Sequence, residues 1–147
     1  MFNILKTFNQ KKIILLYIFL STILTIFIVG PENFNPIKEN WLYKNDRAHD
    51  LIVWKYFYND NWSFPLGLNK NFGLSVSNSL AFSGSPPLFA FIFKILKPVL
   101  PNNFNFFSTL IFVNIFLQVW FAYLIIFKLT NNKLFSFLSS FLFILIP

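Results

Sequence analysis

Uninterrupted apolar runs constrain what this chain can fold into more than any other feature of its sequence. Residues 13–30 form 18 consecutive residues without a charged side chain, and residues 104–127 form a second run of 24. Runs of this length can cross the hydrocarbon core of a bilayer as helices. Because 56% of the 147 residues are hydrophobic, a soluble globule of this size could not bury them all. The sequence therefore predicts an all-α, polytopic membrane protein.

The charges around these runs predict a topology. Residues 1–12 carry three lysines and no acid, which places the N-terminus on the cytoplasmic side. A cleaved signal peptide is the alternative, but no small-residue cleavage site follows residue 30. We therefore expect an outer loop over 31–103 and a cytoplasmic turn over 128–133. Residues 134–147 read as a truncated third span, so we expect this chain to be the N-terminal part of a protein that needs further spans.

The distribution of charge narrows the classes of partner. The formal net charge is +7, but the basic residues are spread among the apolar runs and form no patch interleaved with base-stacking aromatics. We therefore expect the lipid bilayer as a partner and no nucleic acid. All five acidic residues fall between residues 32 and 60. We therefore expect a polar functional site at the membrane surface just beyond the first span. The absence of cysteine excludes disulfides and thiolate catalysis.

Residues 86–97 predict a helix that lies in the outer membrane interface. Two lysines at the centre of a span would cost about 5–7 kcal/mol, whereas the apolar residues of this segment would return only about 3–5 kcal/mol. Lys94 and Lys97 lie off a continuous apolar stripe, and Ser85 is the expected N-cap. The stripe consists of Leu88, Phe91, Ile92, Ile95, Leu96 and Val99.

A second helix is predicted near residues 46–58, and it carries the candidate chemistry. At its start Asp46, His49 and Asp50 follow the spacing i, i+3, i+4, which places them on one face. Such a set could bind a divalent metal ion, or one carboxylate could act as a general base. The alternative is structural, since an aspartate at a helix start commonly serves as the N-cap. Residues 61–82 read as a turn-rich loop.

The second apolar run contains two polar residues, Asn114 and Gln118. They are four positions apart and share one helix face. Within a bilayer, hydrogen bonding between helices is the expected use of such a pair.

Four motifs resemble a known group of proteins. They are Asn-Asp-Arg-Ala-His-Asp-Leu-Ile-Val-Trp from residue 45, Trp-Ser-Phe-Pro-Leu-Gly from residue 62, Phe-Ser-Gly-Ser-Pro-Pro-Leu-Phe from residue 82, and Phe-Leu-Gln-Val-Trp-Phe-Ala from residue 116. Together they resemble a group of uncharacterised bacterial multi-pass membrane proteins that is similar to the GT-C glycosyltransferases. The resemblance implies location in the bacterial inner membrane and a polyprenyl-phosphate sugar as the donor at its outer face.

The resemblance also implies roles for individual residues. The acidic residue of the first outer loop, which acts as base or metal ligand in GT-C enzymes, falls on Asp46. The Gln-His pair of the group appears as His49-Asp50, and Gly84 stands where the group tends to carry an acid, so Asp50 is a candidate replacement. Arg47, Lys94 and Lys97 are the expected phosphate-binding residues. The alternative function is a non-catalytic membrane assembly or lipid-handling protein.

Overall fold

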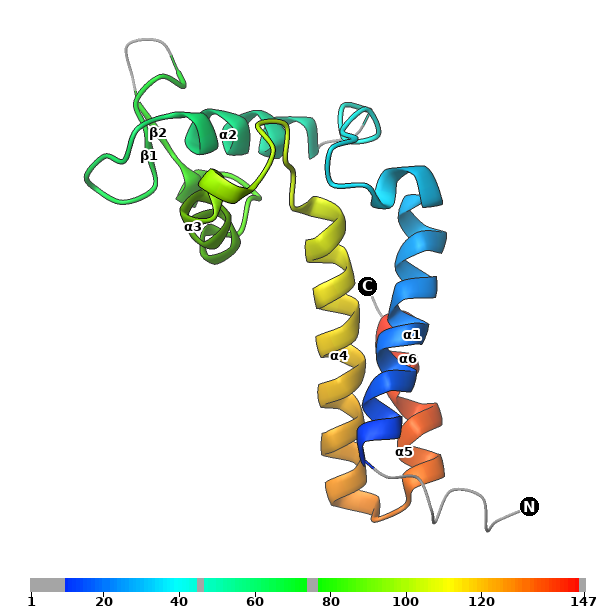
Figure 1. The fold of residues 1–147 in the computed structure, drawn as a ribbon. Helices are drawn as coiled ribbons and strands as arrows, with labels where there is room; N and C mark the ends of the chain where they lie inside the picture. The colour runs from blue at the N-terminus through cyan, green and yellow to red at the C-terminus, as the bar shows by residue number, and fades with distance from the viewer. Residues whose placement is uncertain (1–9, 45–46, 74–76, 146–147) are drawn as a thin grey trace. The chain divides into compact units, whose positions relative to one another are not determined.

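The computed structural model describes residues 10–44, 47–73 and 77–145, and these residues are mostly helical. They form two compact units (Figure 1). Unit 1 comprises the described residues up to Phe34 and from Ser108 onward, and unit 2 comprises Asn35–Phe107.

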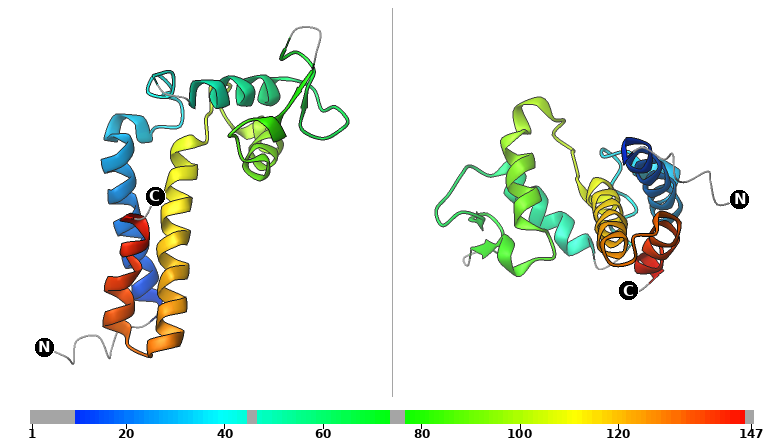
Figure 2. Two further views of the ribbon diagram at one scale, coloured as in Figure 1. Left: turned by 180° about the vertical axis from the view of Figure 1, so that it is seen from behind. Right: turned by 90° about the horizontal axis from the view of Figure 1, so that it is seen from below.

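Unit 1 is built from two long helices and two short ones. The long helices are α1 (Gln10–Val29) and α4 (Phe107–Thr130), and the short helices are α5 (Lys133–Ser140) and α6 (Leu142–Leu145). The short 3-10 helix η2 (Pro31–Phe34) follows α1. Both views in Figure 2 show α5 and α6 beside α1 and α4.

The core of unit 1 is an aromatic cluster around Tyr17, which is fully buried. Its ring lies 5.4–5.9 Å, centroid to centroid, from the rings of Trp120, Tyr123, Phe137 and Phe141. The Tyr17 hydroxyl also hydrogen-bonds to the Ser140 Oγ at 2.9 Å. One side chain of α1 therefore joins α4 and α5.

Most of the surface of α1 and α4 is apolar and open. Within the 18-residue apolar window of each helix, only 28% of the residues of α1 and 22% of those of α4 are buried. Both helices are long and apolar enough to cross a membrane. An apolar surface of this extent requires lipid or further protein to cover it.

The helix bounds of unit 1 differ from the predicted runs at both long helices. Helix α1 begins at Gln10 instead of residue 13 and ends at Val29 instead of residue 30. Helix α4 begins at Phe107 instead of residue 104, because Asn105 donates to the carbonyl oxygens of Pro36 (2.8 Å) and Lys38 (3.2 Å) and so holds residues 104–106 outside the helix. The helix then continues through Lys128, a favourable position for a cation at a helix C-terminus. The predicted turn over 128–133 is thus restricted to Asn131 and Asn132, where Asn131 has a φ of 50° and Asn132 caps α5.

The segment predicted as a truncated third span forms two short helices. The backbone N–H of Phe141 bonds to the Leu138 carbonyl at 3.3 Å, which tightens the last turn of α5 before α6 starts. The predicted hydrogen bond between helices is confirmed for Gln118, whose Nε2 donates to the Phe143 carbonyl of α6 at 2.6 Å.

Unit 2 is organised around α2 (Arg47–Asn59). One face of this helix is buried, through Leu51, Val53, Trp54, Phe57 and Tyr58. The Trp54 Nε1 donates to the Phe104 carbonyl at 3.1 Å, and the Tyr58 hydroxyl donates to the Pro101 carbonyl at 3.3 Å. These bonds satisfy the polar ends of two buried aromatic side chains.

The rest of unit 2 packs against α2. The segment predicted as a loop over 61–82 contains a two-stranded antiparallel ladder, in which β1 (Leu68–Asn69) pairs with β2 (Asn78–Ser79). The ladder forms because Gly67, at a φ of 89°, lets its carbonyl accept from the Leu80 N–H of η3 (Leu80–Phe82). Helix α3 (Pro87–Ile95) follows, and η4 (Lys97–Val99) continues it, so the predicted single helix over 86–97 is two elements.

Candidate functional site

The predicted metal-binding set on α2 is described only in part. Asp46 lies outside the described residues. The His49 side chain is exposed, with its ring centroid 6.0 Å from that of Phe72. The residues that the structure describes contain no group of three or more histidine, aspartate and glutamate side chains that could hold a metal ion.

Asp50 contacts the loop that precedes α3. Its Oδ1 accepts from the Gly84 backbone N–H at 2.7 Å, and its backbone carbonyl accepts from the Ser85 Oγ at 3.1 Å. The prediction that Ser85 caps α3 is therefore wrong, because its hydroxyl is engaged with α2. Pro86 is the N-cap of α3 and makes no side-chain hydrogen bond.

The three predicted phosphate-binding residues separate into two places. Arg47 is exposed at the start of α2, with its guanidinium carbon 5.9 Å from the Trp41 ring centroid. Lys94 and Lys97 line one cavity of about 710 Å³ within unit 2. Arg47 is not among the residues that line this cavity.

Lys94 is buried although it is charged, with 5% of its surface exposed. Its Nζ donates to the Phe57 carbonyl and lies 3.9 Å from the Phe57 ring centroid and 4.9 Å from that of Trp62. A carbonyl oxygen and aromatic faces both stabilise an ammonium group away from water. The α2 face that forms the core of unit 2 therefore also positions this lysine.

The opposite face of α3 is apolar and open. Leu88 is 67% exposed, Ile95 66% and Val99 78%. In a soluble protein this stripe would be buried and the lysine exposed. An exposed apolar stripe of this kind marks a surface for lipid or for another protein.

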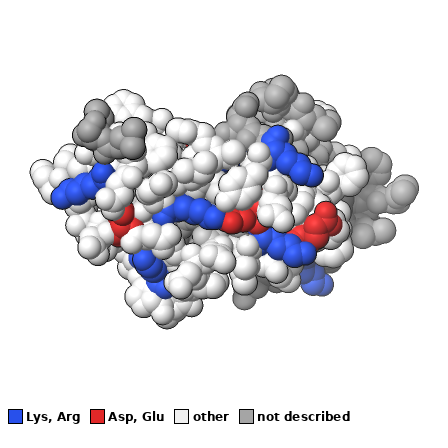
Figure 3. Space-filling model, turned by 90° about the horizontal axis from the view of Figure 1, so that it is seen from above, with Lys and Arg blue, Asp and Glu red and all other residues white. Residues whose placement is uncertain are grey.

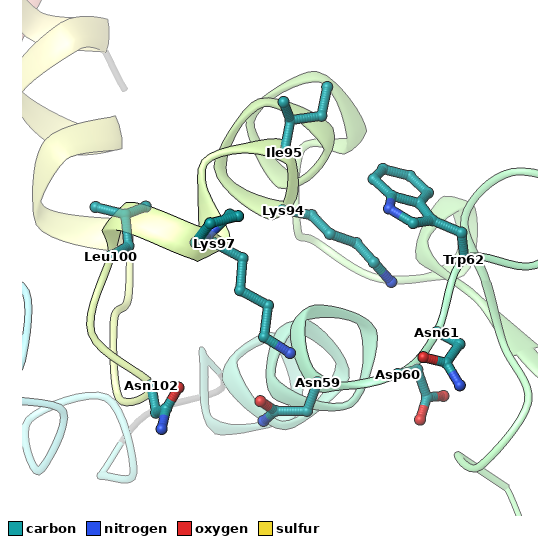
Figure 4. A pocket seen from close by; sticks show the side chains of 10 residues that line it. Asn59, Asp60, Asn61, Trp62, Lys94, Ile95, Lys97, Leu100 and Asn102 are labelled. Atoms are coloured by element: carbon teal, nitrogen blue, oxygen red, sulfur yellow. The ribbon is translucent and has the colours of Figure 1, made fainter.

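The cavity is enclosed by residues from two segments, which Figure 4 shows facing one another. Lys94, Ile95 and Lys97 come from α3 and η4, while Asn59, Asp60 and Trp62 come from the end of α2 and the residues after it. The Lys97 Nζ lies 5.3 Å from the Tyr58 ring centroid. Two lysine side chains therefore line one hollow, and Ile95 belongs both to its lining and to the apolar stripe.

The electrostatics of the cavity leave it short of negative charge. Burial lowers the pKa of Lys94, the nearby Lys97 lowers this pKa further, and Asp60 opposes both effects. A bound anion would favour the protonated form of Lys94 and would offset part of the cost of burying its charge. The cavity is therefore suited to a phosphate or another compact anion.

Residues 18–147 match the family model described as a domain of unknown function, DUF6311. The chain belongs to the DUF6311 family. No curated protein and no solved structure matches it. The matched range of this DUF6311 chain includes all of unit 2 and every candidate residue discussed above.

Asp60 is a cavity residue of the DUF6311 domain that sequence reasoning did not single out. Its Oδ1 accepts from the Asn71 Nδ2, and its Oδ2 lies 3.4 Å from the Asn71 backbone N–H. It also lines two smaller hollows, of about 350 and 220 Å³. The predicted helix ends near residue 58, and the three polar side chains in a row that follow it, Asn59-Asp60-Asn61, were the available signal.

Charges of both signs occur together on the DUF6311 domain. Figure 3 shows acidic side chains next to basic ones on the face that it displays. Glu39 forms an ion pair with Lys55, and Asp60 acts electrostatically on Lys94.

Proposed function

We propose that this chain belongs to a GT-C type membrane glycosyltransferase that takes a polyprenyl-phosphate sugar at the outer face of the bacterial inner membrane. The observation that carries the proposal is the pairing of Lys94 and Lys97 in one cavity beside the exposed apolar stripe of α3. A lipid-linked phosphate needs both parts, a cationic site for the phosphate and an apolar surface for the chain.

The geometry of α3 supports this division of roles. Ile95 is exposed on the stripe and also lines the cavity, so the stripe and the cavity meet at this residue. In the proposed topology the stripe lies on the bilayer and the N-terminus is cytoplasmic. The leaving phosphate would then remain close to two cations as the sugar is transferred.

In the proposed reaction an acceptor hydroxyl attacks the anomeric carbon of the sugar. A bond between the acceptor oxygen and this carbon forms, the bond from this carbon to the phosphate oxygen breaks, and the acceptor proton passes to a base. The resemblance assigns that role to Asp46. Lys94 and Lys97 would stabilise the charge that develops on the departing polyprenyl phosphate.

A divalent metal ion fits the described residues only in part. His49 and Asp50 are consecutive on α2, so their side chains leave the helix about 100° apart. Asp50 already accepts the Gly84 N–H with one oxygen. Any metal site here therefore depends on Asp46.

The test is transfer of a radiolabelled sugar from polyprenyl phosphate in membranes that contain the natural full-length protein. We expect Asp46→Asn to abolish transfer while expression is unchanged, and the double variant Lys94→Met, Lys97→Met to lose binding of the donor. Glu32→Gln, which removes an exposed carboxylate outside the cavity, is the control. Unchanged turnover in Asp46→Asn would remove this residue from the mechanism.

One observation favours a second candidate, a non-catalytic lipid-handling or assembly protein. The cavity presents binding groups, whereas His49 and Asp50, the described side chains predicted for the metal, do not line it. In this case Asp46→Asn would be tolerated, and polar substitutions in the stripe from Leu88 to Val99 would abolish function.

A further inference from the structure

We infer that the cavity also contains a binding site for the hydroxyl groups of a sugar ring, in which Asp60 accepts the hydrogen bonds and Trp62 forms an apolar wall. This inference rests on the proposed function, because it places the sugar of a sugar phosphate beside the lysines that bind its phosphate. It assigns a binding role to two residues that neither the resemblance nor the predicted metal set includes.

The Asp60 carboxylate is held in a fixed orientation. Both of its oxygens face Asn71, one toward the side-chain amide and one toward the backbone N–H. A carboxylate has about four acceptor positions, so about two remain for donors from a ligand. A carboxylate held in this way accepts hydroxyl donors without first having to be ordered.

The cavity is lined by charges of both signs. Asp60 is the one carboxylate among the residues that line the cavity, and it partly offsets the charge of Lys94. A site for phosphate alone gains nothing from a carboxylate in its wall, since the two anions repel each other. A ligand that carries both a phosphate and hydroxyl donors matches the lysines and Asp60 together.

The cavity does not suit a simple cationic head group. An amine on Asp60 would lie in the field of both Lys94 and Lys97, which repel it. The volume of about 710 Å³ is within the range of small-molecule sites and accommodates more than a phosphate. Asn59, Asn61 and Asn102 add donors and acceptors around the cavity, as a polyhydroxylated ring requires.

Trp62 supplies the apolar part of the site. It is 51% exposed at the cavity and is supported by Phe91, whose ring is stacked on it at 6.3 Å between centroids. Figure 4 shows Trp62, Asn61 and Asp60 following one another along the same wall. The C–H groups of a sugar ring can lie against the indole while its hydroxyls reach the carboxylate.

The experiment measures binding to the full chain in lipid nanodiscs with three probes, namely polyprenyl phosphate, the same lipid carrying a hexose on its phosphate, and a water-soluble hexose 1-phosphate. Asp60→Asn and Trp62→Ala are the test variants, and Glu32→Gln is the control. We expect Asp60→Asn to weaken binding of the glycosylated lipid about tenfold, because a hydrogen bond to a charged group is lost. Binding of bare polyprenyl phosphate should be unchanged or tighter, because a repulsive charge is removed.

The outcomes separate this inference from the proposed function. Equal affinity of the wild-type chain for the bare and the glycosylated lipid would overturn the sugar site and leave the phosphate site standing. An equal loss for both lipids in Asp60→Asn would overturn it too, since the role of Asp60 would then be structural. Binding of the soluble hexose phosphate with the same sensitivity to Asp60→Asn would support the sugar site and identify a free ligand as its source. If the wild-type chain binds none of the three probes, the proposed function and the sugar site both fail.

Discussion

The Asp50 carboxylate occupies the space that a side chain at Gly84 would need. A Cβ atom at residue 84 would lie 2.4 Å from the Asp50 Oδ2 and 2.9 Å from its Cγ, closer than such atoms approach in proteins, and 3.0 Å from its Oδ1. The same carboxylate accepts the Gly84 N–H at 2.7 Å. Any side chain at residue 84 therefore forces the Asp50 carboxylate to move.

This contact predicts the effect of Gly84→Ala. The new methyl group displaces the Asp50 carboxylate and removes its hydrogen bond, so we expect the protein to lose about 1–2 kcal/mol of stability. Urea unfolding in detergent, followed by near-ultraviolet circular dichroism, measures the loss. In an Asp50→Ala background the steric conflict is absent, so Gly84→Ala should then cost less than about 0.5 kcal/mol. An equal cost in both backgrounds would contradict the prediction.

The sequence predicted α2 and α3 well because each combines an apolar period with clear ends. It also placed Lys94 and Lys97 off the apolar stripe of α3, and the buried position of Lys94 agrees with that. Sequence spacing did not reveal the Asp50–Gly84 contact, which joins residues 34 positions apart. It favoured a set of ligands within one helix because local spacing is all that a single helix pattern contains.

Asp60 was missed for a related physical reason. A polar run after a helix is usually a solvated turn, and only the packing of α3 against α2 turns this one into the wall of a cavity. The ladder of β1 and β2 was likewise not predictable from strands of two residues. Helix formation in the long, uncharged runs was predictable from their apolar composition. The bounds of these helices were not, because they depend on contacts of Asn105 and on the backbone conformation of Asn131.

Lys94 predicts a dependence of stability on pH. Burial and the charge of Lys97 lower its pKa below the usual 10.5, against the opposing effect of Asp60. Between the folded-state pKa and 10.5 the unfolded chain binds a proton that the folded chain has released, so stability rises with pH in this window. Below the folded-state pKa the cost of burying the charge is constant.

Thermal unfolding of the wild type and of Lys94→Met across this pH window tests the prediction. The stability of the wild type relative to the variant should increase as the pH approaches 10.5. A difference that stays flat across the window would show that Lys94 titrates normally. Lys97→Met is a poorer control than Lys38→Met, because Lys97 itself acts on Lys94.

Lys55 predicts the opposite behaviour. Burial lowers its pKa, but hydrogen bonds to Glu39 and Tyr43 and the charge of Glu39 outweigh this effect, so the pKa rises above 10.5. The stabilisation is fully present below 10.5 and is lost as the pH rises through the folded-state pKa. Since the pair is partly exposed, we expect Glu39→Gln to cost only about 0.5–1 kcal/mol below 10.5. Unfolding at low and high salt measures this cost, which should shrink with salt.

The apolar stripe of α3 predicts contact with lipid. Leu88, Ile95 and Val99 are exposed, and a charged side chain among them would be repelled by the hydrocarbon boundary. A bromine-labelled lipid should quench a fluorophore attached at residue 88, and Ile95→Glu should reduce this quenching. Lys70→Glu, an exposed charge change elsewhere in unit 2, is the matched control. Equal quenching in wild type and Ile95→Glu would place the stripe away from lipid.

We expect the hydrogen bond between Tyr17 and Ser140 to contribute much less to stability than the aromatic contacts of Tyr17 do. Tyr17→Phe removes only the hydroxyl and should cost about 0.6 kcal/mol, the average for hydrogen bonds between membrane helices. Tyr17→Ala also removes the contacts with two aromatic rings of α4, one of α5 and the ring of Phe141, and should cost about 3–5 kcal/mol. A double-mutant cycle of Tyr17→Phe with Ser140→Ala, measured by denaturant unfolding in micelles, isolates the energy of the hydrogen bond. Additive effects of the two changes would show that the hydrogen bond contributes nothing to stability.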